Sequence, residues 1–162
     1  MNFKELFEVG VNFDTFVGTG SKSERDRIPK NYSRVIFSEE FIKSIRNYDK
    51  KINFLISAEM WCFDAQLNST VVKKICELNS NFDLKVITKG RGEKFVKPLL
   101  EIDNFKIPTI LVLDENFELL GMFIEKPETV KLENFEDIKM DYLKGAYLKD
   151  TASQIGNIIL NR

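Results

Sequence analysis

The sequence of 162 residues contains no histidine and only two cysteines. Without histidine, the chain by itself cannot form Ser-His or Cys-His catalytic pairs, or a metal site that uses histidine. Two cysteines are too few for a disulfide framework or a thiolate zinc site, so we predict a reducing, cytoplasmic setting. Hydrolase and metalloenzyme activities are therefore disfavoured.

Long hydrophobic runs are also missing: none approaches the roughly 18 residues that a membrane span needs. The first five residues, MNFKE, lack the layout of a signal peptide. The formal net charge of -1 gives no overall attraction to nucleic acid or to a membrane surface. We therefore expect neither as a partner. A hydrophobic content of 43% is enough for one globular core.

The first fifty residues have a helical pattern and no strand-like hydrophobic run. Ser21 and Glu24 fit a capping box at the start of one helix. Pro29 is expected to end or kink that helix. Ser38 is expected to begin another short helix. We predict that residues 1–50 form a helical extension packed on a domain of residues 51–162.

From residue 51 the pattern alternates between strands and helices. The predicted strands are residues 52–57, 83–88, 109–113 and 117–124, with a hairpin turn at 114–116. The predicted helices are 62–78, 90–102 with an interruption at Pro98, and one long closing helix from Phe135 to Ile159. This order predicts an α/β fold with three layers and a right-handed first crossover.

Two short motifs accompany this order: Trp61-Cys62 at the first strand-to-helix turn, and the segment Ile107-Pro108-Thr109 before the third strand. Together they resemble the thioredoxin fold, which implies a mixed four-stranded sheet with helices on both faces. The resemblance also implies that Pro108 has a cis peptide bond and faces Cys62.

A bacterial group of thioredoxin-like proteins with a helical N-terminal extension is the most similar. The segment FDTFVGTG, residues 13–20, is similar to that extension. The Trp-Cys-Gly-Asp site of the group is matched by Trp61, Cys62 and Asp64, whereas Phe63 replaces the glycine. The resemblance covers nearly the whole chain.

The sequence departs from the thioredoxin pattern at two positions. Ala65 replaces the second cysteine of the Cys-x-x-Cys motif, and Ile56 stands where thioredoxins carry a buried acid. Cys76 cannot replace the missing thiol, because fourteen helical residues separate it from Cys62 by about 20 Å, whereas a disulfide requires Cα atoms within roughly 7 Å. We expect Cys76 to be a small buried hydrophobic residue, and dithiol catalysis is excluded.

The reactivity of Cys62 is left open by the sequence. The N-terminus of the following helix favours the thiolate, whereas the carboxylate of Asp64 opposes it, and each effect is on the order of 1 kcal/mol. Cys62 is therefore either a reactive thiol or an unreactive remnant of the family scaffold.

Further candidate binding residues surround this turn. Lys89 and Arg91 should lie at the same sheet edge as Cys62, where they either bind an anion such as a glutathione carboxylate or form an ordinary solvated loop. Trp61 is either an exposed platform for a partner or a core residue. Phe63 is expected to point outward.

Two functions follow. The first is monothiol exchange, in which Cys62 forms a mixed disulfide with a partner protein or glutathione, with no other cofactor. The alternative is a non-catalytic module that binds an extended segment between Trp61 and Pro108. We expect a monomer or weak dimer. Four residues of the closing helix either mediate dimerisation or pack on the sheet of their own chain: Tyr142, Tyr147, Leu148 and Ile158.

Overall fold

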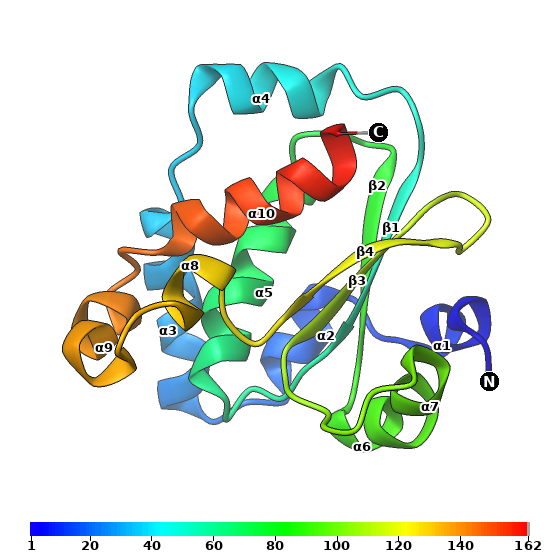
Figure 1. The fold of residues 1–162 in the computed structure, drawn as a ribbon, viewed down its shortest axis with the longest axis horizontal. Coiled ribbons are helices and arrows are strands. Elements are labelled where there is room, and N and C mark those ends of the chain that lie inside the picture. The colour runs from blue at the N-terminus through cyan, green and yellow to red at the C-terminus, as the bar shows by residue number, and fades with distance from the viewer. Residues whose placement is uncertain (162) are drawn as a thin grey trace.

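A computed structural model describes residues 1–161 and contains one sheet of four strands (Figure 1). The strands are β1 (Ile52–Ser57), β2 (Phe82–Ile87), β3 (Thr109–Leu113) and β4 (Leu119–Ile124), in the order β2-β1-β3-β4. β1 pairs parallel with β2 and antiparallel with β3, and β3 pairs antiparallel with β4. The predicted mixed four-stranded sheet is confirmed.

Ten α-helices and one π-helical turn make up the rest of the described regular structure. The extension contains α1 (Phe3–Val9), α2 (Phe13–Gly18), α3 (Lys22–Arg34) and α4 (Glu39–Arg46). The domain contains α5 (Phe63–Cys76), α6 (Lys89–Arg91), the π-helical turn η1 (Gly92–Val96), α7 (Lys97–Leu100), α8 (Glu128–Lys131), α9 (Phe135–Leu143) and α10 (Leu148–Leu160).

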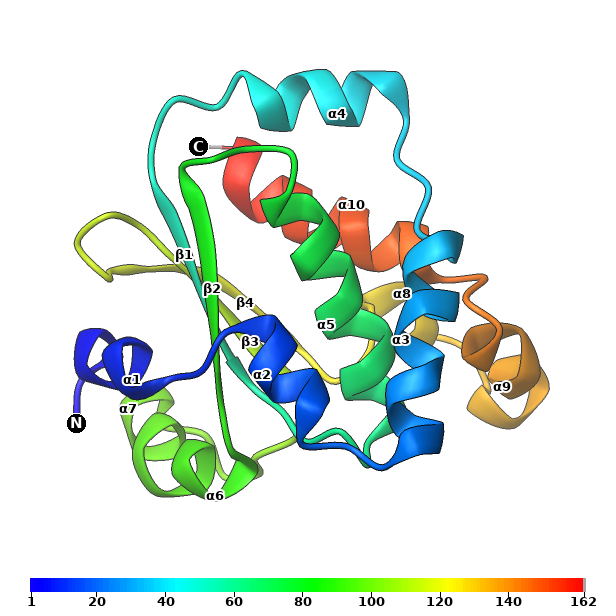
Figure 2. The same cartoon turned by 180° about the vertical axis from the view of Figure 1, so that it is seen from behind.

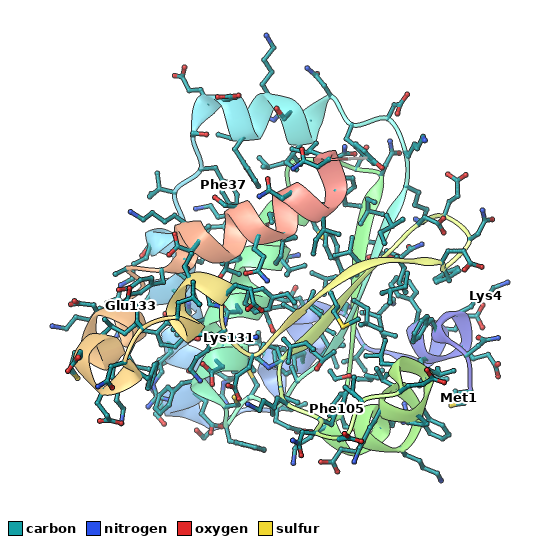
Figure 3. The ribbon with its side chains drawn as sticks, viewed as in Figure 1. Met1, Lys4, Phe37, Phe105, Lys131 and Glu133 are labelled. Carbon is teal, nitrogen blue, oxygen red and sulfur yellow. The ribbon has the colours of Figure 1, made fainter. Side chains whose placement is uncertain are left out.

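Helices cover both faces of the sheet, as predicted for three layers. Figures 1 and 2 show α3, α5 and α10 on one side, and α1 with α6 and α7 on the other. Alternate side chains of β1 serve the two layers: Phe54 and Ile56 join the core under α5, and Leu55 joins the core under α1. Phe105, labelled in Figure 3, packs so tightly on Gly92 that any side chain there would collide with its ring.

The N-terminal extension contributes to both cores. Leu6 and Phe7 of α1 pack with Leu55 in one core, whereas Phe16 of α2 lies in the other. The extension also makes one antiparallel bridge that the helical prediction missed, between Val11 and Val86 of β2. The extension is therefore packed on the domain, and the division at residue 50 stays a prediction.

The prediction of one long closing helix is wrong. The chain instead turns between α9 and α10 at Gly145, whose φ of 90° lies in the left-handed region that favours glycine. A Cβ atom at this position would also lie 3.0 Å from Leu148 Cδ1 and 3.1 Å from Arg34 Cδ. The hydrophobic periodicity continues on both sides of this turn, which is why it predicted a single helix.

Helix starts were predicted better than helix interruptions. Ser21 and Glu24 form the expected capping box, and Ser38 caps α4. Pro29 does not end its helix, because α3 continues to Arg34. Since Pro29 lies on the exposed side, water can hydrogen-bond the carbonyl that loses its helical donor. Pro98 lies in the first turn of α7, directly after the π-helical turn, so the interruption is a change of helix type.

The β3–β4 turn is longer than predicted. The Oδ1 atom of Asp114 accepts hydrogen bonds from the backbone N–H groups of Asn116 and Glu118. Phe117 has a φ of 63° and belongs to this turn, so β4 begins at Leu119.

We predict that Leu6→Ala lowers the free energy of unfolding by about 3 kcal/mol, because it leaves a cavity in a core shared with the sheet. Urea denaturation would measure the change. Val9→Ala is the matched control, since Val9 is exposed on the same helix, and should change stability by less than about 0.5 kcal/mol. Equal effects of the two substitutions would show that α1 is not part of the cooperative core.

Candidate functional site

Cys62 stands where the turn after β1 enters α5. It is the N-cap residue of that helix, with extended backbone angles, and its carbonyl accepts the first helical hydrogen bond from Gln66. Trp61 is 60% exposed and Phe63 is 47% exposed, whereas Cys62 between them is half-buried. Trp61 is thus exposed rather than a core residue, and Phe63 points outward as expected.

The sulfur of Cys62 faces the loop before β3. The thiol donates a hydrogen bond to the carbonyl oxygen of Ile107, with 3.8 Å between Sγ and the oxygen. The Ile107–Pro108 peptide bond is cis. Ile107, Pro108 and Thr109 are all buried, so the exposed surface beside the thiol comes from Trp61 and Phe63.

The pKa of the Cys62 thiol is raised, and burial is the largest cause. The backbone of Ala65 and Asp64 at the start of α5 lowers the pKa, although the Cys62 side chain makes no capping hydrogen bond there. The carboxylate of Asp64 raises the pKa, and the ammonium of Lys126 lowers it. The sequence pointed to a balance between the helix N-terminus and Asp64, but burial, which raises the pKa as Asp64 does, is larger than either effect. At neutral pH the thiol is therefore mainly protonated.

Asp64 is held in a hydrogen-bond network. Its Oδ1 atom accepts a hydrogen bond from the Tyr142 hydroxyl at 2.5 Å, and its Oδ2 atom lies 3.2 Å from Lys126 Nζ. Asn68 Nδ2 donates to the Tyr142 oxygen at 3.1 Å, and Thr151 Oγ1 donates to Asn68 Oδ1 at 2.7 Å. Burial and the neighbouring carboxylate raise the pKa of Tyr142, so its hydroxyl remains a donor.

Sequence reasoning missed Lys126 and Asn68 as neighbours of the thiol site, and it gave Tyr142 a different role. Tyr142 packs within its own chain, one of the two alternatives that the sequence left open, but nothing local pointed to Asp64. Tyr142 and Leu148 are buried in the core of their own chain and cannot serve as dimer contacts. Tyr147 and Ile158 also pack against that core.

Lys89 and Arg91 lie beside the turn that precedes Cys62, because the backbone N–H of Lys89 donates to Glu59 Oε2 at 2.8 Å. Both side chains are engaged within the chain. Lys89 Nζ lies 3.1 Å from Glu93, and Arg91 Nη1 donates to the carbonyl of Val9 at 3.5 Å. These contacts favour an ordinary loop over an anion site.

Cys76 lies at the opposite end of α5 from Cys62, and both cysteines are free. Cys76 packs against the hydrophobic core, and burial raises the pKa of its thiol. The structure thus agrees with Cys76 as a small hydrophobic residue. Within residues 1–161, no group of three or more cysteine, aspartate or glutamate side chains is placed to bind a metal ion.

The comparison with known families agrees with this geometry. A family model described as thioredoxin matches residues 10–139. The chain belongs to the thioredoxin family. In this thioredoxin-family protein, both residues at which we expected a departure from the thioredoxin pattern, Ala65 and Ile56, are fully buried. None of the helices in the described part of the chain is long and apolar enough to cross a membrane.

Two solved structures are 30% identical to the chain over nearly its whole length. A protein of unknown function from Pseudomonas aeruginosa aligns with 98% of this chain and 97% of its own, at a TM-score of 0.92. An HIV epitope-scaffold aligns with 100% of this chain and 99% of its own, at a TM-score of 0.93.

More distant similarity carries no functional argument. An alkylhydroperoxide reductase structure from Enterococcus faecalis is 18% identical over 59% of this chain and 49% of its own, at a TM-score of 0.45. No curated protein matches the sequence.

We predict opposite shifts in the pKa of Cys62 from two substitutions in the network. Asp64→Asn removes a negative charge and should lower the pKa, whereas Lys126→Gln removes a positive charge and should raise it. The rate of Cys62 alkylation against pH, followed by mass spectrometry in a Cys76→Ser background, measures both. Asp49→Asn, which removes an exposed charge elsewhere, should leave the profile unchanged. Shifts of the same sign would contradict the electrostatic account.

Proposed function

We propose that this protein is a monothiol exchange protein that forms mixed disulfides through Cys62. The observation that supports this most directly is the placement of the sulfur. It belongs to the N-cap residue of α5, where the backbone N–H groups of Asp64 and Ala65 lower its pKa, and its neighbour Trp61 is exposed. Such N–H groups stabilise the thiolate when the proton leaves.

The proposed exchange needs only a disulfide and a thiol as reactants. The Cys62 thiolate attacks one sulfur of a partner protein's disulfide or of oxidised glutathione, and the other sulfur leaves as a thiolate that takes up a proton. Ala65 has no sulfur to attack the mixed disulfide. A second, external thiol must therefore release Cys62, and the two free cysteines suit a reducing compartment such as the cytoplasm.

We predict that glutathione addition to Cys62 is slow at neutral pH and accelerates as the pH rises towards the raised pKa of the thiol. Incubation with oxidised glutathione at several pH values, followed by intact-mass measurement, gives the rate. Cys76→Ser should keep the adduct and Cys62→Ser should abolish it. No adduct at any pH below about 10, where an ordinary thiol is ionised, would exclude the exchange function.

The second candidate is a binding module without turnover. It is favoured by the raised pKa of Cys62 and by the exposure of Trp61 and Phe63 on both sides of it. Exposed aromatic side chains are frequent sites of strong binding energy in protein interfaces. In this case the thiol would be dispensable.

The two functions differ in which residue they require. If the protein is a binding module, Trp61→Ala should weaken partner binding by about 2 kcal/mol, roughly thirtyfold, whereas Cys62→Ser leaves it unchanged. Titration of a partner isolated under reducing conditions would measure this. Leu132→Ala is the control, because Leu132 is exposed on a different segment. Loss of binding in Cys62→Ser would instead favour exchange.

A further inference from the structure

A pocket lies next to the thiol site and has no role in the proposed exchange. It is a cavity of about 270 Å³ between α3, the first turns of α5 and the end of α9. Phe63, Leu67 and Leu143 supply its apolar walls. Four basic residues also line it: Arg27, Lys30, Arg34 and Lys144.

Three of these basic residues share one face of α3. The side chains on this face follow the i, i+3, i+4, i+7 spacing of a helix: Arg27, Lys30, Asn31 and Arg34. A helix that packs on a core normally carries hydrophobic residues at this spacing. Within residues 1–161, none of the four basic side chains forms an ion pair. The acid nearest in sequence to Phe63, Asp64, is already bound by Lys126 and Tyr142.

Arg27 is half-buried, and its guanidinium stacks over the Phe63 ring at 4.5 Å from the ring centroid. This contact keeps the guanidinium of Arg27 in the lining of the cavity, and the aromatic ring does not neutralise its positive charge. Gly145 permits Arg34 to reach the same cavity, since a side chain at that position would meet the Arg34 stem.

Two buried amides in the lining also lack partners. Asn31 is only 4% exposed, and its side chain makes no hydrogen bond within the described chain. Gln66 is 1% exposed; its Nε2 atom donates to the Met60 carbonyl, but its Oε1 atom has no partner. Buried polar groups are normally hydrogen-bonded, so the enclosed Gln66 oxygen is an unsatisfied acceptor beside the pocket. The amide atoms of Asn31 are not enclosed in this way and remain available to a polar ligand.

We propose that this basic pocket binds a small molecule that carries a phosphate group or two carboxylates. Clustered unpaired cations attract a multivalent anion, and Arg and Lys donate charge-assisted hydrogen bonds to its oxygens. The amide of Asn31, which lines the pocket, supplies further donors. The apolar walls suit a compact organic part, and the volume excludes a folded segment.

The pocket shares Phe63 with the thiol site, so a bound anion would lie beside Trp61-Cys62. The inference goes beyond the exchange function and does not depend on it, because no lining residue is a cysteine. A protein with an unreactive Cys62 would still bind the anion.

The test is isothermal titration calorimetry of the full chain with inorganic phosphate, pyrophosphate and citrate, at constant ionic strength. We expect one site for at least one anion. The double variant Lys30→Gln/Arg34→Gln should weaken binding at least about tenfold, and Asn31→Asp should weaken it as well by charge repulsion. The phosphate and citrate arms distinguish the two kinds of anionic group.

The matched control is Lys43→Gln/Arg46→Gln, which removes two exposed charges from α4 outside the lining. It should keep affinity within about twofold, because it leaves the local charges unchanged. Circular dichroism would confirm that every variant is folded. No binding of any of the three anions below about 10 mM would overturn the proposal, and so would equal loss in the control.

Discussion

β1 is buried along its whole length, and the rest of the fold follows from the need to cover it. The strand lies between β2 and β3, and all six of its residues are inaccessible to solvent. Since its side chains alternate between two faces, both faces need hydrophobic cover. α5 and α10 cover one face, whereas the short segments α6, η1 and α7 leave room on the other that α1 fills with Leu6 and Phe7. The N-terminal extension is thus required by the strand.

The same burial sets the chemistry at the end of β1. A thiol at a helix N-terminus would ordinarily be acidic, but here partial burial, beside the carbonyl of Ile107, opposes ionisation. Asp64 cannot move away from the sulfur, because Tyr142 and Lys126 hold both of its oxygens. The family scaffold is therefore retained while the pKa of its remaining thiol is raised.

The sequence alone was sufficient to predict the features that are determined by residues close together along the chain. The run from Ile52 to Ser57 and the capping box at Ser21 identified a strand and a helix start, and two separated motifs identified the family. Features that depend on residues far apart in the sequence were not predicted. The two partners of Asp64 lie 62 and 78 positions along the chain. The turn at Gly145 was not predicted, because the hydrophobic periodicity is the same on both sides of it. The basic face of α3 was not predicted, because the pocket that gives it meaning is completed by residues of α5 and α9.

The bridge between Val11 and Val86 has a consequence for how the protein meets other chains. The outer edge of β2 would otherwise present free backbone groups, which can pair with a strand of another molecule. Val11 instead exchanges both of its backbone hydrogen bonds with Val86, at 2.9 and 2.8 Å. The close approach is possible because Gly10 has no side chain to meet Lys85. At Val86 the extension therefore occupies the backbone groups that a strand of another molecule would need to pair with this edge.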